Sequence, residues 1–405
     1  DLKLVNNTTE NSIDTNYLKI MVDSDNPVSY SSLTDGTIKS DITLNPSEEV
    51  VIDVRLWLDI TTPNTQIGKT FDGKLMVEGE GEEYIDLSRT SSEMLEYLGL
   101  SAKSGTPNFG NDATTDEGIY SAQDDYGTSY YFRGAVQNNY VKFANKYWRI
   151  IRINGDGTIR LIYDGTSAHA NGESSTDRQI GTSVYNNTYG DNAYVGYMMG
   201  IDNQCTSGSC SGSTKTTSYN QAHSNTYSST IKKAVDNWYK TNIVDAGYSD
   251  KVADVIYCND RSMKSGTGYG TTVTYYGAYQ RIVDGNNPVL TCTNQNDRFT
   301  VEDTSKGNGA LTYPVGLITA DEMSMGGAVY GSSNSSYYLY TGNYYWTMSP
   351  YVFNSGVAVE FLVHSNGYID NDYVYNSRGV RPVLSLKSDI SVTGSGTQND
   401  PFLVQ

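Results

Sequence analysis

Histidine is the residue type that could act as a general base in this sequence, and it occurs three times, at His169, His223 and His364. His169 lies in the polar stretch Ser167–Asn171, where it could in principle activate a serine. The sequence has no Gly-x-Ser-x-Gly elbow and places no triad. We therefore predict that the protein is not an enzyme, with a hydrolase as the minor alternative.

Carboxylates could bind calcium in two places, at Asp370 with Asp372 and at Glu80, Glu82 and Glu83. Neither place has the Asp-x-Asp-x-Asp-Gly pattern of a calcium loop, and acidic turns are usually solvated. We predict no metal site and no cofactor, and leave calcium at these turns open.

The four cysteines predict two disulfides. Cys205 and Cys210 flank a Thr-Ser-Gly-Ser segment that is short and polar enough to close into a ring, which leaves Cys258 and Cys292 for a second bridge. Zinc is the alternative, but paired Cys-x-x-Cys motifs are missing and no histidine is near these cysteines. Two disulfides indicate an oxidising compartment.

Tyrosine marks a candidate binding surface. The segment Tyr330–Asn376 holds 10 of the 35 Tyr residues, and Asn, Ser and Gly fill much of the rest. This composition is typical of paratopes, because Tyr gives contact area at low entropy cost. We predict that the ligand-binding residues are Tyr344, Tyr351, Asn354, Tyr368, Asp370, Asn371, Tyr373 and Asn376. The alternative is that Tyr packs on a broad sheet face, and we expect Trp346 and Arg381 to belong to the scaffold.

The composition favours a secreted β-rich protein. Charged residues make up 18%, and 28 Lys and Arg against 46 Asp and Glu leave a net charge of −18. That balance argues against nucleic-acid binding, and no apolar run is long enough to predict a membrane span. The chain begins at Asp1 without a signal-like segment, so we expect a mature extracellular or cell-surface protein; a shortened chain is the alternative.

Charge also divides the chain. Residues 1–120 hold 22 acidic and 8 basic residues, a net of −14, and the remainder holds 46 − 22 = 24 acidic and 28 − 8 = 20 basic residues, a net of −4. We predict an acidic assembly domain at 1–110, a linker at 111–127 and a Tyr-rich domain at 128–405.

Periodicity predicts an α+β, β-rich chain. Apolar residues alternate with polar ones from Val50 to Ile60, which is typical of a half-buried strand. Further strands are predicted at Tyr17–Val22, Lys74–Glu78, Tyr140–Phe143, Tyr147–Ile153, Thr158–Tyr163, Tyr344–Met348, Val357–His364, Tyr368–Tyr375 and Val380–Leu386. Helices are predicted at Ser91–Leu98, after Ser229 and near Thr319. The second domain is therefore mixed, and the first is expected to be an antiparallel β-sandwich.

The first hundred residues resemble secreted matrix-fibre proteins of the TasA and camelysin type. The resemblance rests on Asn45-Pro46-Ser47, the alternating strand that follows, and the segment Asn64–Leu75. It implies a jelly-roll-like subunit that assembles through an N-terminal donor strand. Leu2, Leu4 and Val5 would form that strand, while the alternative is an ordinary edge strand that folds back on its own domain.

Residues 126–405 are similar to C-terminal regions of surface and pilin-like proteins of gut Bacilli, which are thought to have a C-type-lectin-like fold. The motifs are Tyr140–Phe143 with Tyr147–Ile151, Tyr345–Pro350, Gly379–Leu386 and Gly394–Phe402. Glu-Pro-Asn and Trp-Asn-Asp, the calcium-lectin sugar motifs, are absent. Formylglycine-generating enzymes share the broader fold, but their chemistry needs an active-site cysteine pair.

Together these observations predict a secreted, non-enzymatic surface protein of bacteria. Its first domain would build a head-to-tail homopolymer, and its second domain would display a site for a surface glycan or protein. The alternative is a monomeric secreted binding module, and a hydrolase or formylglycine-enzyme-like catalyst is the third reading.

Overall fold

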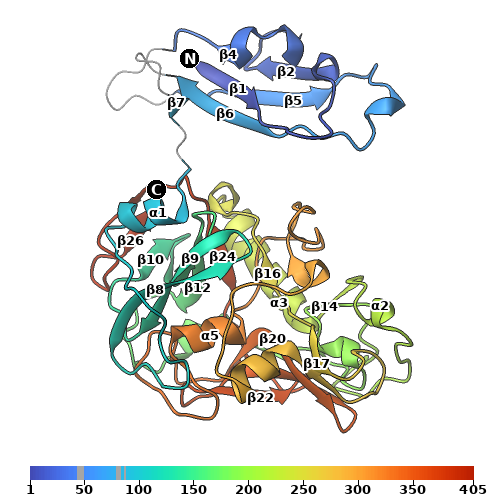
Figure 1. Cartoon of the computed structure of the whole chain (residues 1–405), viewed down its shortest axis with the longest axis vertical. Coiled ribbons are helices and arrows are strands. Elements are labelled where there is room, and N and C mark those ends of the chain that lie inside the picture. The colour runs from blue at the N-terminus through green and yellow to red at the C-terminus, as the bar shows by residue number, and fades with distance from the viewer. Residues whose placement is uncertain (43–49, 79–83, 86–87) are drawn as a thin grey trace. The chain divides into compact units, whose positions relative to one another are not determined.

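The computed structural model describes residues 1–42, 50–78, 84–85 and 88–405 (Figure 1). The chain is β-rich with a few short helices, as the α+β prediction expects. It divides into two compact units, Asp1–Leu87 and Ser88–Gln405. This division lies before the boundary at 110 that the sequence predicts, and part of the predicted linker at 111–127 is a strand, Asp116–Asp124.

The first unit contains two small sheets. One has the order β4-β1-β6-β7, formed by Thr37–Lys39, Leu2–Asn6, Gly73–Glu78 and Tyr84–Ile85. The other has the order β3-β2-β5, formed by Val28–Ser29, Leu18–Val22 and Val54–Leu58. The motif Asn45–Ser47, on which the fibre-protein resemblance partly rests, lies outside the described residues, as do Glu80, Glu82 and Glu83. The jelly-roll arrangement stays a prediction.

The predicted assembly strand, Leu2, Leu4 and Val5, is the interior strand β1 of its own sheet. It is antiparallel to β6, with Leu4 opposite Leu75, and to β4, with Leu2 opposite Lys39. Leu4 is buried. In the single chain β1 is therefore folded back on its own unit, as the alternative interpretation of the sequence expects. It lies in the interior of the sheet, however, and not at its edge.

The alternating segment from Val50 to Ile60 forms β5 but is not half-buried, and this expectation was wrong. Leu18, Ile20 and Val22 of β2 are buried, whereas their partners across the strand pair are more exposed. Leu56 is 41% exposed, Leu58 48% and Ile60 fully. Alternation sets which residues share a face, but burial also needs another layer against that face.

The second unit is built on an eight-stranded sheet. Its continuous path is β24-β12-β11-β10-β26-β25, formed by Val383–Leu386, Ile159–Gly165, Lys146–Ile153, Tyr140–Phe143, Phe402–Val404 and Val392–Thr393. The hairpin β8 (Asp116–Asp124) and β9 (Gly127–Gly134) joins this sheet through β11. The strands predicted at 140–143, 147–153 and 158–163 are confirmed within two residues.

A seven-stranded sheet carries the candidate binding residues. Its strands are β13 (Thr182–Ser183), β23 (Arg378–Gly379), β20 (Tyr345–Asn354), β18 (Thr274–Tyr276), β17 (Met263–Ser265), β21 (Val357–Val363) and β22 (Ile369–Tyr373). Two further strand pairs are β14 (Met198–Met199) with β15 (Tyr227–Ser228) and β16 (Tyr257–Cys258) with β19 (Arg298–Phe299).

The described residues form five α-helices: α1 (Ser91–Tyr97), α2 (Tyr219–Ala222), α3 (Thr230–Tyr239), α4 (Gly277–Tyr279) and α5 (Ala320–Gly326). Ser229 caps α3, because its side chain accepts the N–H of Lys232, and Thr319 forms a capping box with Glu322 at α5. Single π-helical turns extend α3 over Lys240–Val244 and α4 over Gln280–Asp284. The three predicted helices are therefore confirmed.

Short 3-10 helices make up the remaining helical segments: Thr15–Tyr17, Tyr30–Ser32, Thr34–Gly36, Asn64–Gln66, Thr176–Arg178, Asn192–Val195, Ser249–Lys251 and Gln295–Asp297. One large hydrophobic core runs through the second unit, and it includes the fully buried Trp148 and Trp346. No helix among the described residues has the length and apolarity to cross a membrane.

Both predicted disulfides are present. Cys205 pairs with Cys210 and Cys258 pairs with Cys292, each with its Cα atoms 5.7 Å apart. The second bridge links β16 to a loop 34 residues further along the chain. The even number of cysteines and the short 205–210 spacing were sufficient to assign both pairs.

Candidate functional site: a polar and aromatic sheet surface

Three antiparallel strands, β20, β21 and β22, carry most of the predicted ligand-binding residues. Between β20 and β21, Ser355 and Gly356 have φ angles of 52° and 79°, as two-residue hairpin loops prefer. The next turn is the predicted one at Ser365–Gly367, where the N–H of His364 donates to the carbonyl of Tyr368 at 2.9 Å. These two turns fix the register, and the register decides which side chains share a face.

The register divides the predicted residues between two faces. On one face, Asp370 and Asp372 stand opposite Leu362 and Glu360; on the other, Asn371 and Tyr373 stand opposite Phe361 and Val359. Successive side chains of a strand point to opposite faces. The single surface that the sequence predicts is therefore two surfaces.

The first surface is the His364 cluster, which we define as Tyr344, His364, Tyr368, Asp372 and Arg378. The His364 ring lies almost parallel to the Tyr368 ring, with centroids 4.2 Å apart and an angle of 13°. The Tyr344 hydroxyl is 2.6 Å from Nε2 of His364. Arg378 reaches over Tyr344, with its Cζ 4.6 Å from the ring centroid, and donates to Asp372 at 2.7 Å. All five residues are partly exposed.

The hydrogen bonds of His364 fix its tautomer. Its Nδ1 accepts the backbone N–H of Asn366 at 3.0 Å, so that nitrogen carries a lone pair. The ring proton then lies on Nε2 and is donated to the Tyr344 oxygen. Among the described residues, His364 is the one hydrogen-bond partner of that oxygen, so the Tyr344 hydroxyl proton can be donated to a ligand.

Two further predicted residues, Asn376 and Asp370, adjoin this cluster. Asn376 donates to Asp372 at 2.6 Å, which leaves the Asp372 carboxylate bonded to both Asn376 and Arg378. Burial and the neighbouring Asp370 carboxylate raise the pKa of Tyr368, so its hydroxyl remains a hydrogen-bond donor at neutral pH. The cluster thus presents ring faces, a guanidinium and hydroxyl donors together.

The second surface is the Tyr351 cluster, made of Tyr275, Tyr279, Tyr330, Tyr351 and Asn371. Tyr330 and Tyr351 are nearly parallel, at 10°, and their hydroxyl oxygens are 3.2 Å apart. Asn371 donates to the Tyr330 hydroxyl at 2.8 Å, and Tyr279 contacts Tyr351 with ring centroids 5.1 Å apart. Burial raises the pKa of Tyr351. These rings contact one another, as the packing alternative proposes.

The remaining predicted residues lie apart from both clusters. Tyr373 is 47% exposed and stacks on Tyr375, which contacts Tyr189 at a centroid distance of 4.8 Å. Asn354 is an exposed residue at the turn between β20 and β21. Neither position contributes to the His364 cluster.

Sequence reasoning missed three members of the His364 cluster as ligand-binding residues: His364, Asp372 and Arg378. Asp372 was weighed only as a possible calcium ligand. His364 was weighed only as a possible base, yet it directly precedes the predicted Ser365–Gly367 turn and faces Tyr368 across it. A register drawn from that turn would have placed it beside Tyr368. Arg378 comes from β23, which pairs with β20 at one position only, and no local pattern indicates that contact.

Trp346 and Arg381 belong to the scaffold, as the sequence predicts. Trp346 is fully buried and its indole N–H donates to the carbonyl of Ser183 at 2.9 Å. Arg381 is buried and donates to Asp164 and to the carbonyls of Tyr163 and Leu339. Asp164 also accepts from Arg178 at 2.8 Å, so one buried carboxylate holds two arginines.

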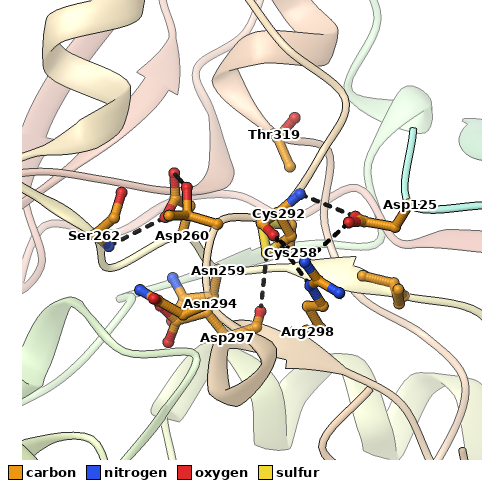
Figure 2. Close-up of a disulfide and its surroundings, with 12 residues drawn as sticks. Asp125, Cys258, Asn259, Asp260, Ser262, Cys292, Asn294, Asp297, Arg298 and Thr319 are labelled. Atoms are coloured by element: carbon orange, nitrogen blue, oxygen red, sulfur yellow. Dashed lines mark hydrogen bonds and ion pairs between the residues drawn. A yellow bond between two sulfur atoms is a disulfide. The ribbon is translucent and has the colours of Figure 1, made fainter. Parts of the chain in front are cut away.

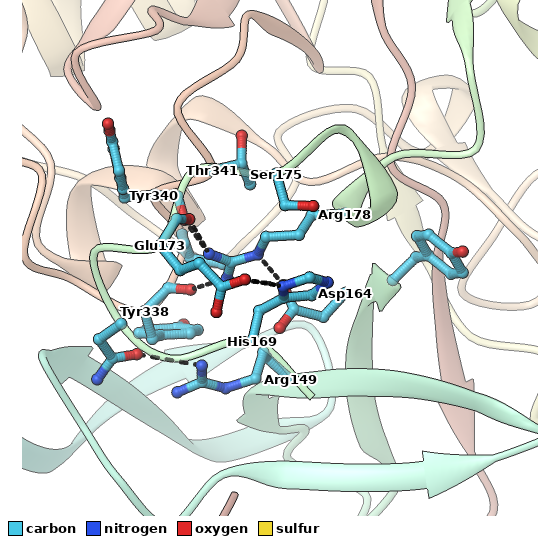
Figure 3. A network of polar contacts seen from close by, with 12 residues as sticks. Arg149, Asp164, His169, Glu173, Ser175, Arg178, Tyr338, Tyr340 and Thr341 are labelled. Atoms are coloured by element: carbon cyan, nitrogen blue, oxygen red, sulfur yellow. Dashed lines mark hydrogen bonds and ion pairs between the residues drawn. The ribbon is translucent and has the colours of Figure 1, made fainter. Parts of the chain in front are cut away.

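His169 does not have the geometry of a general base for serine. Figure 3 shows its ring beside Glu173. Its Nδ1 is 2.7 Å from Glu173 and its Nε2 is 2.9 Å from Asp177, while the Ser167 hydroxyl is more distant at 3.4 Å. Burial would raise the pKa of Asp177, but hydrogen bonds from His169 and Thr166 outweigh it and lower that pKa to about 2. Each ring nitrogen of His169 is thus within hydrogen-bond distance of a carboxylate.

A charged cavity of about 30 Å³ lies near the Cys258–Cys292 disulfide. Its walls include Arg152, which contacts Asp124 at 2.6 Å and Glu322 at 3.0 Å. Figure 2 shows Asp125 beside the disulfide, where it accepts the N–H of Cys292 at 2.9 Å. The cavity has room for water but not for a substrate-sized ligand. The described residues contain no group of three His, Cys, Asp or Glu side chains that could hold a metal ion.

No protein-family model matches this chain, and no curated protein or solved structure is significantly similar to it. The chemistry of the site therefore rests on its own geometry. Stacked rings, an arginine and hydroxyl donors on an open sheet suit binding by stacking and hydrogen bonding.

Proposed function

We propose that the protein is a secreted, non-enzymatic surface protein of bacteria, with residues 1–87 as an assembly module and residues 88–405 as a ligand-binding module. The observation that supports assembly is a set of exposed apolar side chains on the strands of the first unit. Leu56 and Leu58 on β5 are joined by Leu75 and Val77 on β6, which are 53% and 51% exposed.

Two of these residues lie directly opposite buried ones. Leu75 pairs with the buried Leu4, and Leu56 pairs with the buried Ile20. Because each of these side chains is only about half exposed, its full burial would add roughly 1 kcal/mol of stabilisation. Contact with another subunit would recover part of this stabilisation. The polymer that we propose is a filament.

Strand donation in this filament requires β1 to leave the interior of its own sheet, because β1 is paired on both sides. Deleting residues 1–11 would remove an interior strand and is therefore a poor test. A reversible disulfide between β1 and β6, which we call the β1 lock, is a better test. Leu2 and Val77 face each other, so Leu2→Cys with Val77→Cys would link the two strands covalently.

The test is electron microscopy of the oxidised and reduced lock variant over a concentration and salt series. We expect filaments only after reduction, whereas a control lock on β8 and β9, Gln123→Cys with Thr128→Cys, should permit filaments in both states. Filaments from the oxidised β1 lock would exclude strand donation. Absence of filaments from the wild-type chain under all conditions would exclude the filament itself.

A monomeric binding module for glycan or protein is the second candidate, and the His364 cluster favours it. Tyr368→Ala removes the ring that stacks on His364, and Tyr373→Ala is a matched control outside the cluster. On an array of glycans and surface proteins, a captured ligand should be lost with Tyr368→Ala and retained with Tyr373→Ala. Equal binding by both variants would place the ligand elsewhere.

A further inference from the structure

β5 presents an unpaired edge in the first unit. Among the described residues it pairs only with β2 (Figure 1). The backbone of Asp53 and Asp59 points toward β2, because the Asp53 carbonyl accepts from Asp23 at 2.6 Å and the Asp59 N–H donates to Tyr17 at 2.7 Å. Backbone groups alternate in direction along a strand, so those of Leu56 and Leu58 point outward.

We propose that β5 pairs antiparallel with β5 of a second copy of this chain, with Leu56 opposite Leu58 of the second copy. The two-fold axis then passes beside Trp57, and the order of the joined sheet is β3-β2-β5-β5-β2-β3. An exposed edge strand is a template for this kind of pairing.

Only a few registers are open to such a pair. Two antiparallel edges hydrogen-bond only where outward-pointing residues face each other. Within β5 this allows a two-fold axis beside any of its five residues, Val54, Arg55, Leu56, Trp57 or Leu58. The registers differ in how they place the charged residues that flank these positions.

Charge disfavours three of these registers. An axis beside Arg55 would place the two Arg55 side chains opposite each other. An axis beside Leu56 would place Asp53 opposite Asp59 of the second copy, which is repulsive. An axis beside Leu58 would place Arg55 opposite the uncharged Thr61. The axis beside Trp57 places Arg55 opposite Asp59 of the second copy twice, once on each side. An axis beside Val54 would likewise place Arg55 opposite Asp53 of the second copy. Only the axis beside Trp57, however, also brings Leu56, Trp57 and Leu58 of the two copies together.

The same register brings the exposed apolar side chains together. Leu56 and Leu58 lie on the face of the buried Ile20 and Leu18, so pairing would extend this apolar face across the two-fold axis. Trp57, 39% exposed on the opposite face, would lie beside Trp57 of the second copy. Tryptophan is among the residues that contribute most to interfaces.

The ion pair that Arg55 makes within its own chain does not oppose its pairing with Asp59 of the second copy. Arg55 donates to Asp53 of its own chain at 2.6 Å, but the two side chains are 61% and 51% exposed, and such pairs contribute little. Charges then restrict the register, and the exposed apolar residues select among the remaining registers and supply the affinity. The interface is small, so the dissociation constant is expected in the micromolar range. The dimer uses two of the exposed side chains that support assembly, Leu56 and Leu58, but it is a separate contact from strand donation by β1 and, as a two-fold contact, closes on itself.

A cysteine at the two-fold axis tests the geometry in the full chain. The four native cysteines are all in disulfides, so Trp57→Cys adds a single free thiol. Directly opposed, non-hydrogen-bonded residues are close enough for a disulfide. We expect rapid covalent dimer formation under mild oxidation, while Ile67→Cys, exposed but outside β5, should react slowly. Equal rates for the two variants would overturn the proposal.

Charge reversal tests the register. By sedimentation velocity, Arg55→Asp alone and Asp59→Arg alone should abolish the concentration-dependent dimer, and the double variant should restore it. Circular dichroism verifies folding of each variant, and the cysteine test stands even where Asp59→Arg unfolds the first unit. A wild-type chain that remains monomeric at the highest concentration, or a dimer unaffected by Arg55→Asp, would overturn the proposal.

Discussion

Glu360 and Asp372 face each other across β21 and β22, yet their carboxyl groups lie in opposite environments. Asp372 is partly exposed and accepts hydrogen bonds from Arg378 and Asn376. Glu360 is fully buried, and neither of its side-chain oxygens has a partner among the described residues. Burial raises the pKa of Glu360 well above its usual value. One strand pair thus carries an exposed, bonded carboxylate and a buried, protonated carboxyl.

Replacing Glu360 by Gln should stabilise the protein at alkaline pH. Because the pKa of Glu360 is raised in the folded state, its contribution to stability is complete below the unfolded-state pKa and is lost as pH rises through the folded-state pKa. Gln carries no ionisable proton, so the variant should gain about 1–3 kcal/mol in free energy of unfolding at high pH. Urea unfolding from pH 5 to 9 measures this gain. The exposed Glu302→Gln should leave the pH dependence unchanged, and parallel curves for all three proteins would contradict the prediction.

His223 should make the second unit less stable in mild acid. Burial and the charge of Arg261 lower the pKa of His223 to about 3, so its contribution to stability is complete above the unfolded-state pKa and declines as pH falls through the range down to the folded-state pKa. Between neutral pH and pH 5 the wild type should lose about 2 kcal/mol through this group. His223→Gln should remove that part of the decline in urea unfolding. A wild-type slope retained in the variant would assign it to other groups.

The two disulfides should differ in their contribution to stability. Cys258–Cys292 closes a loop with a sequence separation of 34, and Cys205–Cys210 one with a separation of 5. In the chain-entropy account, their removal costs about 3–4 and about 2 kcal/mol respectively, because the longer loop restricts the unfolded chain more. Paired Cys→Ala variants, compared by urea unfolding, test the order. A larger loss from the short loop would contradict it.

Loss of the Asp164 carboxylate should be strongly destabilising. Asp164 is fully buried between Arg178 and Arg381, so Asp164→Ala leaves two buried guanidinium groups without their anion. We expect a loss of about 3–5 kcal/mol in the free energy of unfolding. Asp250→Ala is the matched control, since Asp250 is exposed and 3.7 Å from Lys251, and it should cost under about 1 kcal/mol. Similar losses from both variants would contradict the prediction.

Local sequence determined the parts of this fold whose interactions are local. Ser229 and Thr319 start helices because each side chain caps an N–H three residues ahead, and both are visible as sequence patterns. The strand Tyr140–Phe143 follows from its composition, and the turn at Ser365–Gly367 from its residue types. The short 205–210 spacing likewise gave both disulfide pairs.

Tertiary structure decided what depends on contacts between distant segments. Leu2–Asn6 reads equally well as a donor strand or a folded-back strand, and only its pairing with β4 and β6 shows that in the single chain it lies within its own sheet. Leu56 and Leu58 alternate as a buried strand would, but burial depends on a covering layer, and the described residues of the first unit leave these two side chains 41% and 48% exposed. His364 joins Tyr344 and Tyr368 only through the strand register. Periodicity along one strand fixes which side chains share a face, while the partners of that face come from elsewhere in the chain.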